Sequence, residues 1–204
     1  MTFLETILEE TLQIFKKEGI EANSEEQLIQ KLDIRESTYN EMFKSKTDLV
    51  KATVLFDLET QEREHVRILA NAKNPIEEIM LMLQDGLDNL KTINPLYYVD
   101  LQREYPDIWK ICLDHLNSYS YHQISDIINR GIIQSLFRKD VNLQLVTKII
   151  LEQLTMILNP VVFPPDRYNI REVFRSVFLY YIRGICTEEG GKMAEEFFSR
   201  INNK

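Results

Sequence analysis

Two patterns of glutamate and histidine residues have side-chain types that could bind a metal ion. Glu62 and His65 have the Glu-x-x-His spacing that places both side chains on one helix face, as in helical di-iron proteins. Such a site needs a second Glu-x-x-His and two further carboxylates, and the sequence offers no partner motif. His115 and His122 lie seven residues apart without an acidic neighbour at ligand spacing. We therefore expect no metal site and no cofactor.

Enzymatic chemistry has no better support in the sequence. It contains no G-x-S-x-G, no phosphate-cradling glycine loop and no defensible pair of catalytic acids. The polar run around Glu62 reads as a solvated helix surface. We therefore predict that the chain is not an enzyme.

Polar and basic side chains between residues 35 and 46 are spaced so that they would share one exposed face of a short helix. Two short helices, 24–32 and 35–43, joined by Asp33 and Ile34, have the dimensions of a helix-turn-helix. Burying Tyr39, Met42 and Phe43 leaves the rest of the second helix for a major groove. The side chains predicted to point outward or to the flanks are Arg35, Ser37, Thr38, Asn40, Glu41 and Lys44.

Helices must position these residues, because apolar side chains recur three and four apart almost throughout and the chain has only six glycines and six prolines. Start signals include Ser24 with Gln27, Ser45 with Asp48, and Asn169. We predict helices near residues 2–18, 24–32, 35–43, 45–71, 75–92, 95–103, 106–133, 142–158 and 169–187. The fold class is all-α, with a helix-turn-helix domain over 1–50 and a helical-bundle domain for ligand binding and dimerisation over 51–204.

The order of residues over 7–50 resembles the N-terminal domain of TetR-family transcriptional regulators. In that family an I-L-x-x-A-x-x-L-F-x-x-x-G segment precedes a helix-turn-helix ending in F-K-S-K-x-x-L. The run here is ILEETLQIFKKEGIEANSEEQLIQKLDIRESTYNEMFKSKTDLV, with matches at Ile7, Leu8, Ile14, Phe15, Gly19, Ser24, Thr38, Phe43, Lys44, Ser45, Lys46 and Leu49. Chain length and the long helix after the motif extend the likeness loosely over the rest.

The resemblance implies a homodimer that binds a palindromic operator in double-stranded DNA and releases it when a ligand enters the C-terminal body. By position, it implies that Thr38 reads base edges, that Lys46 contacts phosphate and that Lys44 supports this contact. Arg35 is a candidate for contacting a base or a phosphate on the basis of its position alone, and Asn40 can hydrogen-bond to a phosphate or an adenine. The candidate DNA-binding residues are Arg35, Ser37, Thr38, Tyr39, Asn40, Lys44 and Lys46.

Acidic charge keeps a second function open. The chain has a formal net charge of −8, and Glu41 stands on the predicted outward face, where phosphates repel a carboxylate. The first reading is a ligand-responsive regulator, of the repressor type. The alternative is a ligand-binding or protein-interaction module that keeps the regulator fold without binding DNA. Salt-dependent binding to duplex DNA would separate the two.

Aromatic residues concentrate between positions 96 and 122, and a few carry polar tips. Such walls suit a pocket for a small, mostly apolar ligand, whereas a satisfied aromatic core is the competing interpretation. The resemblance implies that helices of the body surround the cavity. The candidate pocket residues are Met80, Leu83, Leu87, Tyr98, Trp109, Cys112 and Tyr119.

The predicted helices over 142–158 and 169–187 offer more apolar surface than one core needs. The resemblance implies a four-helix bundle across a twofold axis, and a monomer with a thick core is the alternative. The candidate interface residues are Leu145, Ile149, Val173, Val177, Tyr181 and Gly184.

Location follows from charge and cysteine usage. No stretch of eighteen residues avoids charge, and the first residues are acidic where a signal peptide is basic. Cys112 and Cys186 are isolated, as in a reducing compartment. We therefore expect a cytoplasmic protein with no membrane partner.

Overall fold

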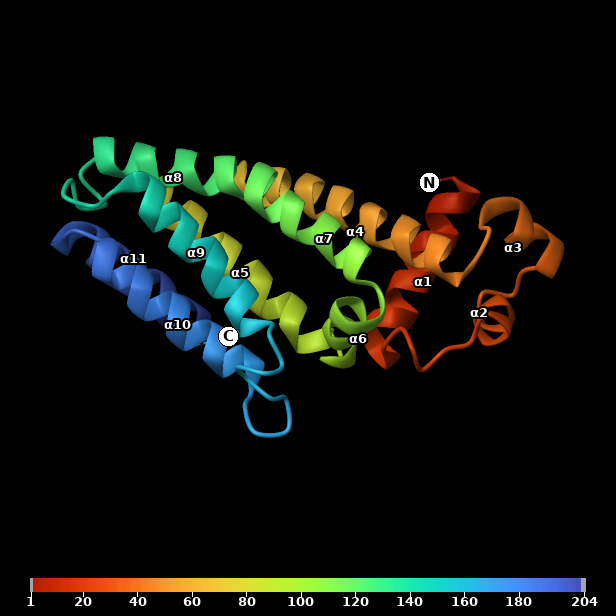
Figure 1. The fold of residues 1–204 in the computed structure, drawn as a ribbon. Helices are drawn as coiled ribbons and strands as arrows, with labels where there is room; N and C mark the ends of the chain where they lie inside the picture. Colours follow the sequence, from red (N-terminus) through yellow and green to blue (C-terminus); the bar gives the residue numbers. More distant parts are fainter. Residues whose placement is uncertain (1, 203–204) are drawn as a thin grey trace. The chain divides into compact units, whose positions relative to one another are not determined.

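The computed structural model describes residues 2–202, and this part of the chain is helical without a β-strand. The predicted all-α class is confirmed (Figure 1). The helices are α1 (Phe3–Glu18), α2 (Glu25–Lys31), α3 (Glu36–Met42), α4 (Lys46–Leu69), α5 (Pro75–Thr92), α6 (Leu96–Glu104), α7 (Pro106–His115), the π-helical turn η1 (Leu116–Ser120), α8 (Tyr121–Ile133), α9 (Leu143–Ile157), α10 (Ile170–Ile185) and α11 (Glu188–Asn202).

Side-chain caps start several helices where the sequence predicts them. Ser24 Oγ accepts a hydrogen bond from the Gln27 backbone N–H at 3.3 Å, and Gln27 Oε1 accepts from the Ser24 N–H at 2.8 Å. This reciprocal pair is a capping box. Asp48 N donates to Ser45 Oγ at 3.3 Å, and Asn169 Oδ1 accepts from the first turn of α10. These bonds satisfy backbone donors that the first helical turn leaves unpaired.

The described residues form two compact units. The head unit comprises residues 2–64 and 92–114, and the body unit comprises residues 65–91 and 115–202. The head unit therefore contains α1 to α3, α4 as far as Glu64, α6, and α7 as far as Asp114. The compact units divide the chain differently from the predicted domains 1–50 and 51–204, because α6 packs on α1 across a long gap in the sequence.

Packing in the head unit explains why α6 belongs to it. The backbone N–H of Asn94 donates to the carbonyl of Lys16 at 2.6 Å, at the C-terminal end of α1. The N–H groups of Ile20 and Glu21 donate to the Asp100 carboxylate at 2.8 and 2.9 Å. The buried core beneath these bonds includes Ile7, Phe15, Leu28, Tyr39, Leu49, Tyr97 and Leu101.

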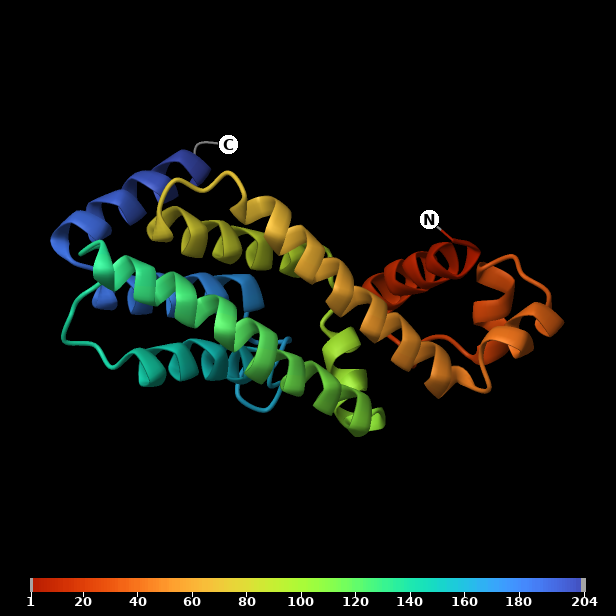
Figure 2. The same cartoon turned by 90° about the horizontal axis from the view of Figure 1, so that it is seen from above.

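The body unit is a bundle in which α9 contacts both α8 and α10 (Figure 2). Its buried core includes Ile79, Met80, Ile127, Phe137, Ile150, Leu151, Phe178 and Ile182. Phe137 packs directly over Gly131, where a Cβ atom would lie 2.1 Å from the phenyl ring. Glycine is therefore the residue that lets this ring close against α8.

The structure refines the predicted helices in two places. The helix predicted over 106–133 is present over these residues without a break, and the π-helical turn η1 joins α7 to α8 within it. No helix is predicted over the residues that form α11. Gly190 lies inside α11, where a Cβ atom would sit 2.1 Å from the carbonyl oxygen of Leu136. The close approach of the Leu136 backbone explains this glycine.

Candidate nucleic-acid interface

Helices α2 and α3 form the predicted helix-turn-helix. The turn between them passes through Asp33, whose φ of 48° lies in the left-handed region. Aspartate tolerates this region better than most residues with a Cβ atom. The Ile34 N–H then donates to the Ile29 carbonyl at 3.3 Å, which closes the turn. Local backbone geometry therefore fixes where α3 begins.

The exposed face of α3 matches the predicted outward face. The side chains of Arg35, Ser37, Asn40 and Lys44 are exposed, and Thr38 is half-buried. Glu36 and Glu41 are exposed on the same short helix. The surface thus offers hydroxyl, amide and cationic groups for base edges and phosphates, together with two carboxylates that oppose phosphate contact.

Tyr39 is the exception among the candidate DNA-binding residues. Its side chain is 0% exposed, and its ring lies 5.5 Å from the Phe43 ring, centroid to centroid. Burial raises the pKa of the phenol. Tyr39 is a core residue in this structure, so the prediction that it contacts DNA is wrong. The helical periodicity of α3 already placed it inward.

Lys46 lies at the start of α4 but does not extend freely into solvent. Its side chain is 19% exposed, and its ammonium lies 2.9 Å from Glu21 Oε1. The hydroxyl of Tyr105 donates to the same carboxylate oxygen at 2.7 Å. Neither partner was predicted, because both lie far from Lys46 in the sequence.

The candidate pocket residues fall into two groups. Met80 and Leu83 are buried in the body-unit core, and Leu87 and Tyr119 are half-buried in the same unit. The other three, Tyr98, Trp109 and Cys112, are half-buried in the head unit, where they pack against its core.

Two of these residues, Cys112 and Tyr119, have a shifted pKa or a side-chain hydrogen bond. Burial, followed by the charge of Asp57, raises the pKa of the Cys112 thiol to about 12. Gln123 Nε2 donates to the Tyr119 hydroxyl at 3.4 Å, while Gln123 Oε1 is buried without a hydrogen-bond partner among the described residues. The body unit thus holds one unsatisfied acceptor beside an aromatic ring.

The candidate interface residues lie on α9 and α10. Leu145 is 59% exposed and Ile149 is 43% exposed, although both are large aliphatic side chains. Val173, Val177 and Tyr181 are half-buried, and no atom lies within 4 Å of the position that a Cβ atom on Gly184 would take. Among these candidates, Leu145 and Ile149 on α9 are therefore the apolar side chains that remain exposed.

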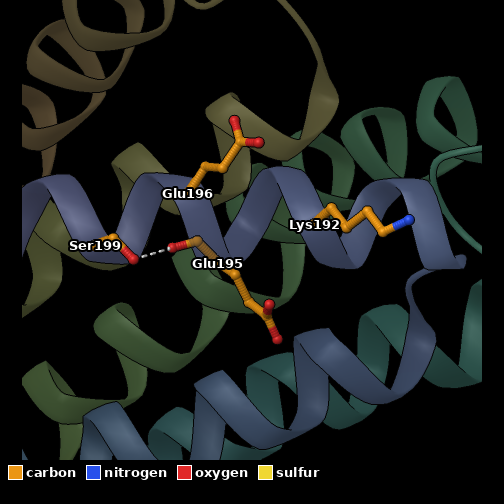
Figure 3. Close-up of a pocket in the computed structure, with 4 residues that line it drawn as sticks. All are labelled: Lys192, Glu195, Glu196 and Ser199. Carbon is orange, nitrogen blue, oxygen red and sulfur yellow. Dashed lines mark hydrogen bonds between the residues drawn. The ribbon is translucent and has the colours of Figure 1, made fainter.

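A hollow of about 520 Å³ on α11 has the wrong chemistry for an apolar ligand. It is lined by Lys192, Glu195, Glu196 and Ser199, and the Ser199 hydroxyl donates to the Glu195 carbonyl at 2.9 Å (Figure 3). All four residues come from one helix, and the hollow is open to solvent. It does not coincide with any candidate pocket residue.

The described residues include neither a cluster of metal ligands nor a helix suited to a membrane. Within residues 2–202, no three His, Cys, Asp or Glu side chains are grouped so that they could hold a metal ion. None of the helices described for this chain combines the length and the apolar character needed to cross a bilayer.

Known structures share this fold. A TetR transcription regulator from Haloarcula marismortui has a TM-score of 0.73 and 17% identity, covering 90% of this chain and 97% of that one. A TetR-family regulator from Cytophaga hutchinsonii has a TM-score of 0.69 and 15% identity, covering 91% and 96%. The TetR-family regulator CifR, a cysteine mutant complexed with 26bp double-strand operator DNA, has a TM-score of 0.64 and 17% identity, covering 87% and 94%.

Sequence comparisons add nothing to this likeness. No protein-family model matches the chain, and no curated protein matches it. The chain has the fold of TetR-family transcriptional regulators, as the N-terminal motif predicts.

Proposed function

We propose that this protein is a TetR-family transcriptional regulator that binds a palindromic DNA operator as a homodimer and releases it when a small, mostly apolar ligand binds. The observation that carries the proposal is the exposed polar face of α3, in a helix-turn-helix and within this fold. Arg35, Ser37, Thr38, Asn40 and Lys44 are the residues proposed to meet DNA, and Lys46 is proposed to reach a phosphate only when it leaves its ion pair with Glu21. Action as a repressor, without enzymatic activity and in the cytoplasm, completes the proposal.

Binding to DNA is tested by selecting duplexes from a random pool at low and physiological salt. The affinity for the selected duplex should fall as salt rises, because cations that neutralise phosphates release counterions. Lys44→Ala should make the slope of log affinity against log salt shallower by about 0.9 per protomer, or about 1.8 for a dimer. Lys192→Ala, an exposed lysine of the body unit, is the matched control and should leave the slope unchanged.

The second candidate function is a module that keeps this fold without binding DNA. Exposed Glu36 and Glu41 on α3 favour it, because carboxylates near phosphates are repelled. Under this alternative no duplex is enriched by selection, and Lys44→Ala changes no measurable property of the protein except its charge.

Dimerisation through α9 and α10 is proposed from the exposed aliphatic side chains of α9. Burying Leu145 and Ile149 against a second copy would remove large aliphatic side chains from water. Sedimentation at micromolar concentration should show a dimer, and Ile149→Glu should shift it to monomer. Val161→Glu, at a position 86% exposed in the loop after α9, is the control and should remain dimeric. A monomeric native chain contradicts this part of the proposal.

Ligand response is proposed for the body unit around Met80, Leu83, Leu87 and Tyr119. Leu87 and Tyr119 are half-buried, and the unpartnered Gln123 Oε1 beside Tyr119 would accept a hydrogen bond from a ligand. Small aromatic and aliphatic compounds can be screened for release of a labelled duplex. An active compound should lose potency against Tyr119→Ala and keep it against Tyr168→Ala, an exposed tyrosine of the same unit.

A further inference from the structure

The strongest unassigned feature of the head unit is the hydrogen-bonded group of Lys46, Glu21 and Tyr105. Glu21 Oε1 receives both the Lys46 ammonium at 2.9 Å and the Tyr105 hydroxyl at 2.7 Å. These bonds from Lys46 and Tyr105 lower the pKa of the Glu21 carboxyl, so it stays ionised at neutral pH. Burial, followed by the bond to Glu21, raises the pKa of Tyr105, so the hydroxyl stays a donor.

The backbone of Glu21 is also held in place by hydrogen bonds. Its N–H and that of Ile20 both donate to Asp100 Oδ2, at 2.9 and 2.8 Å. Asp100 belongs to α6 and Tyr105 follows that helix directly. The segment over 100–105 therefore fixes both the chain and the carboxylate of Glu21. A surface carboxylate that was free to rotate would lack these restraints.

The electrostatic consequence falls on Lys46. A carboxylate 2.9 Å from the Lys46 ammonium weakens the attraction of that ammonium for a phosphate, because the field of the carboxylate opposes that of the ammonium. The side chains of Arg35 and Lys44, by contrast, are exposed. Lys46 is also only 19% exposed, so it must leave Glu21 before it can neutralise a phosphate.

We propose that Glu21 and Tyr105 are positioning residues that hold Lys46 back from the DNA backbone and thereby set how many phosphates the head unit neutralises. This inference rests on the proposed DNA-binding function. Lys46 in the native chain contributes little to the salt dependence of binding. Releasing it adds one phosphate contact per protomer.

The test measures binding to a fluorescent 30-base-pair duplex of random sequence over a series of salt concentrations. Glu21→Gln should steepen the slope of log affinity against log salt by about 0.9 per protomer, which tightens binding at 0.1 M salt, relative to 1 M salt, by about eightfold for each protomer that contacts DNA. Tyr105→Phe should give a smaller gain, because Lys46 still faces the carboxylate. Lys46→Met should leave the native slope almost unchanged but abolish the gain in the Glu21→Gln background.

Controls separate this inference from charge and folding effects. Glu10→Gln removes one exposed acidic charge from α1 without freeing a lysine, and it should keep the native slope. Circular dichroism checks that each variant is folded, and a Glu21→Gln protein that unfolds is replaced by Glu21→Ser. An unchanged slope in these Glu21 variants, or an equal loss on Lys46→Met in both backgrounds, overturns the inference alone. If neither the native chain nor the Glu21 variants bind duplex DNA, the proposed function is overturned with it.

Discussion

Replacing Asp57 with alanine should destabilise the head unit more than any surface charge change, because it strands a cation. Asp57 Oδ1 lies 2.8 Å from the Lys16 ammonium, and the side chains are only 11% and 17% exposed. Gln61 Nε2 donates to the other carboxylate oxygen at 3.1 Å. The Lys16–Asp57 pair ties α1 to α4, and the bond from Gln61 holds the Asp57 carboxylate within α4. Without Asp57, the Lys16 ammonium keeps its burial and loses its counter-charge.

The expected loss of stability depends on whether one partner of a buried ion pair is removed or both are replaced. Removing one partner of a buried pair destabilises by about 3–5 kcal/mol, and the residual exposure here places Asp57→Ala near about 3 kcal/mol. Replacing both partners with apolar residues is about neutral in comparable sites, because no charge is left buried. The double variant Lys16→Met with Asp57→Leu should therefore recover most of the stability lost in Asp57→Ala.

Tryptophan fluorescence provides the assay, because Trp109 is the only tryptophan and packs against the head-unit core. At a urea m-value of about 2 kcal/mol/M, a loss of 3 kcal/mol lowers the midpoint by about 1.5 M. Lys110→Ala is the control, since it breaks an exposed ion pair of α7 and should change the stability by less than about 0.5 kcal/mol.

Two results would refute this reasoning. The first is an Asp57→Ala midpoint equal to that of Lys110→Ala, which would show that the pair is solvated in solution. The second is a double variant as unstable as Asp57→Ala, which would show that packing around Asp57, and not the stranded charge, determines the loss.

Three further perturbations test other parts of the molecule. Tyr39→Phe removes a buried hydroxyl that has no hydrogen-bond partner in residues 2–202, so stability should be unchanged or rise by up to about 1 kcal/mol, with DNA affinity unaffected. Gly190→Ala places a Cβ 2.1 Å from the Leu136 carbonyl oxygen. It should lower the free energy of unfolding by about 3 kcal/mol, whereas Gly191→Ala, with open space, should raise it by up to about 1 kcal/mol in thermal melts. Burial raises the pKa of the Cys112 thiol from 9.0 to about 12, so the stability this thiol contributes is present below pH 9 and lost as pH rises toward 12. Urea midpoints that rise over this range would contradict it.

Local chemistry explains which features the sequence could predict. The Ser24 and Gln27 capping box joins atoms three residues apart, so its two partners are visible in one short window. The exposed face of α3 follows from helical periodicity alone, once Phe43 is placed inward. These features need no knowledge of distant segments, and the structure reproduces them.

Long-range contacts explain what the sequence could not predict. Glu21 is 25 residues from Lys46 and 84 residues from Tyr105, so no local pattern joins the three. Gly190 in α11 is required by the Leu136 backbone, which lies 54 residues earlier in the sequence. The residues predicted to line the pocket illustrate the same limit. Helical spacing does not show which of the two compact units an aromatic side chain belongs to.

The ion pairs of the head unit limit how many of its cations are available to neutralise DNA phosphates. Of the cations near the helix-turn-helix, Lys31 pairs with Glu18 and Lys46 pairs with Glu21. Arg35 and Lys44 remain as exposed cations at the ends of α3. Two phosphates neutralised per protomer give a salt slope of about −1.8, or about −3.6 for a dimer. Such a shallow slope means that hydrogen bonds to base edges, and not backbone charge, must supply much of the affinity for a specific operator.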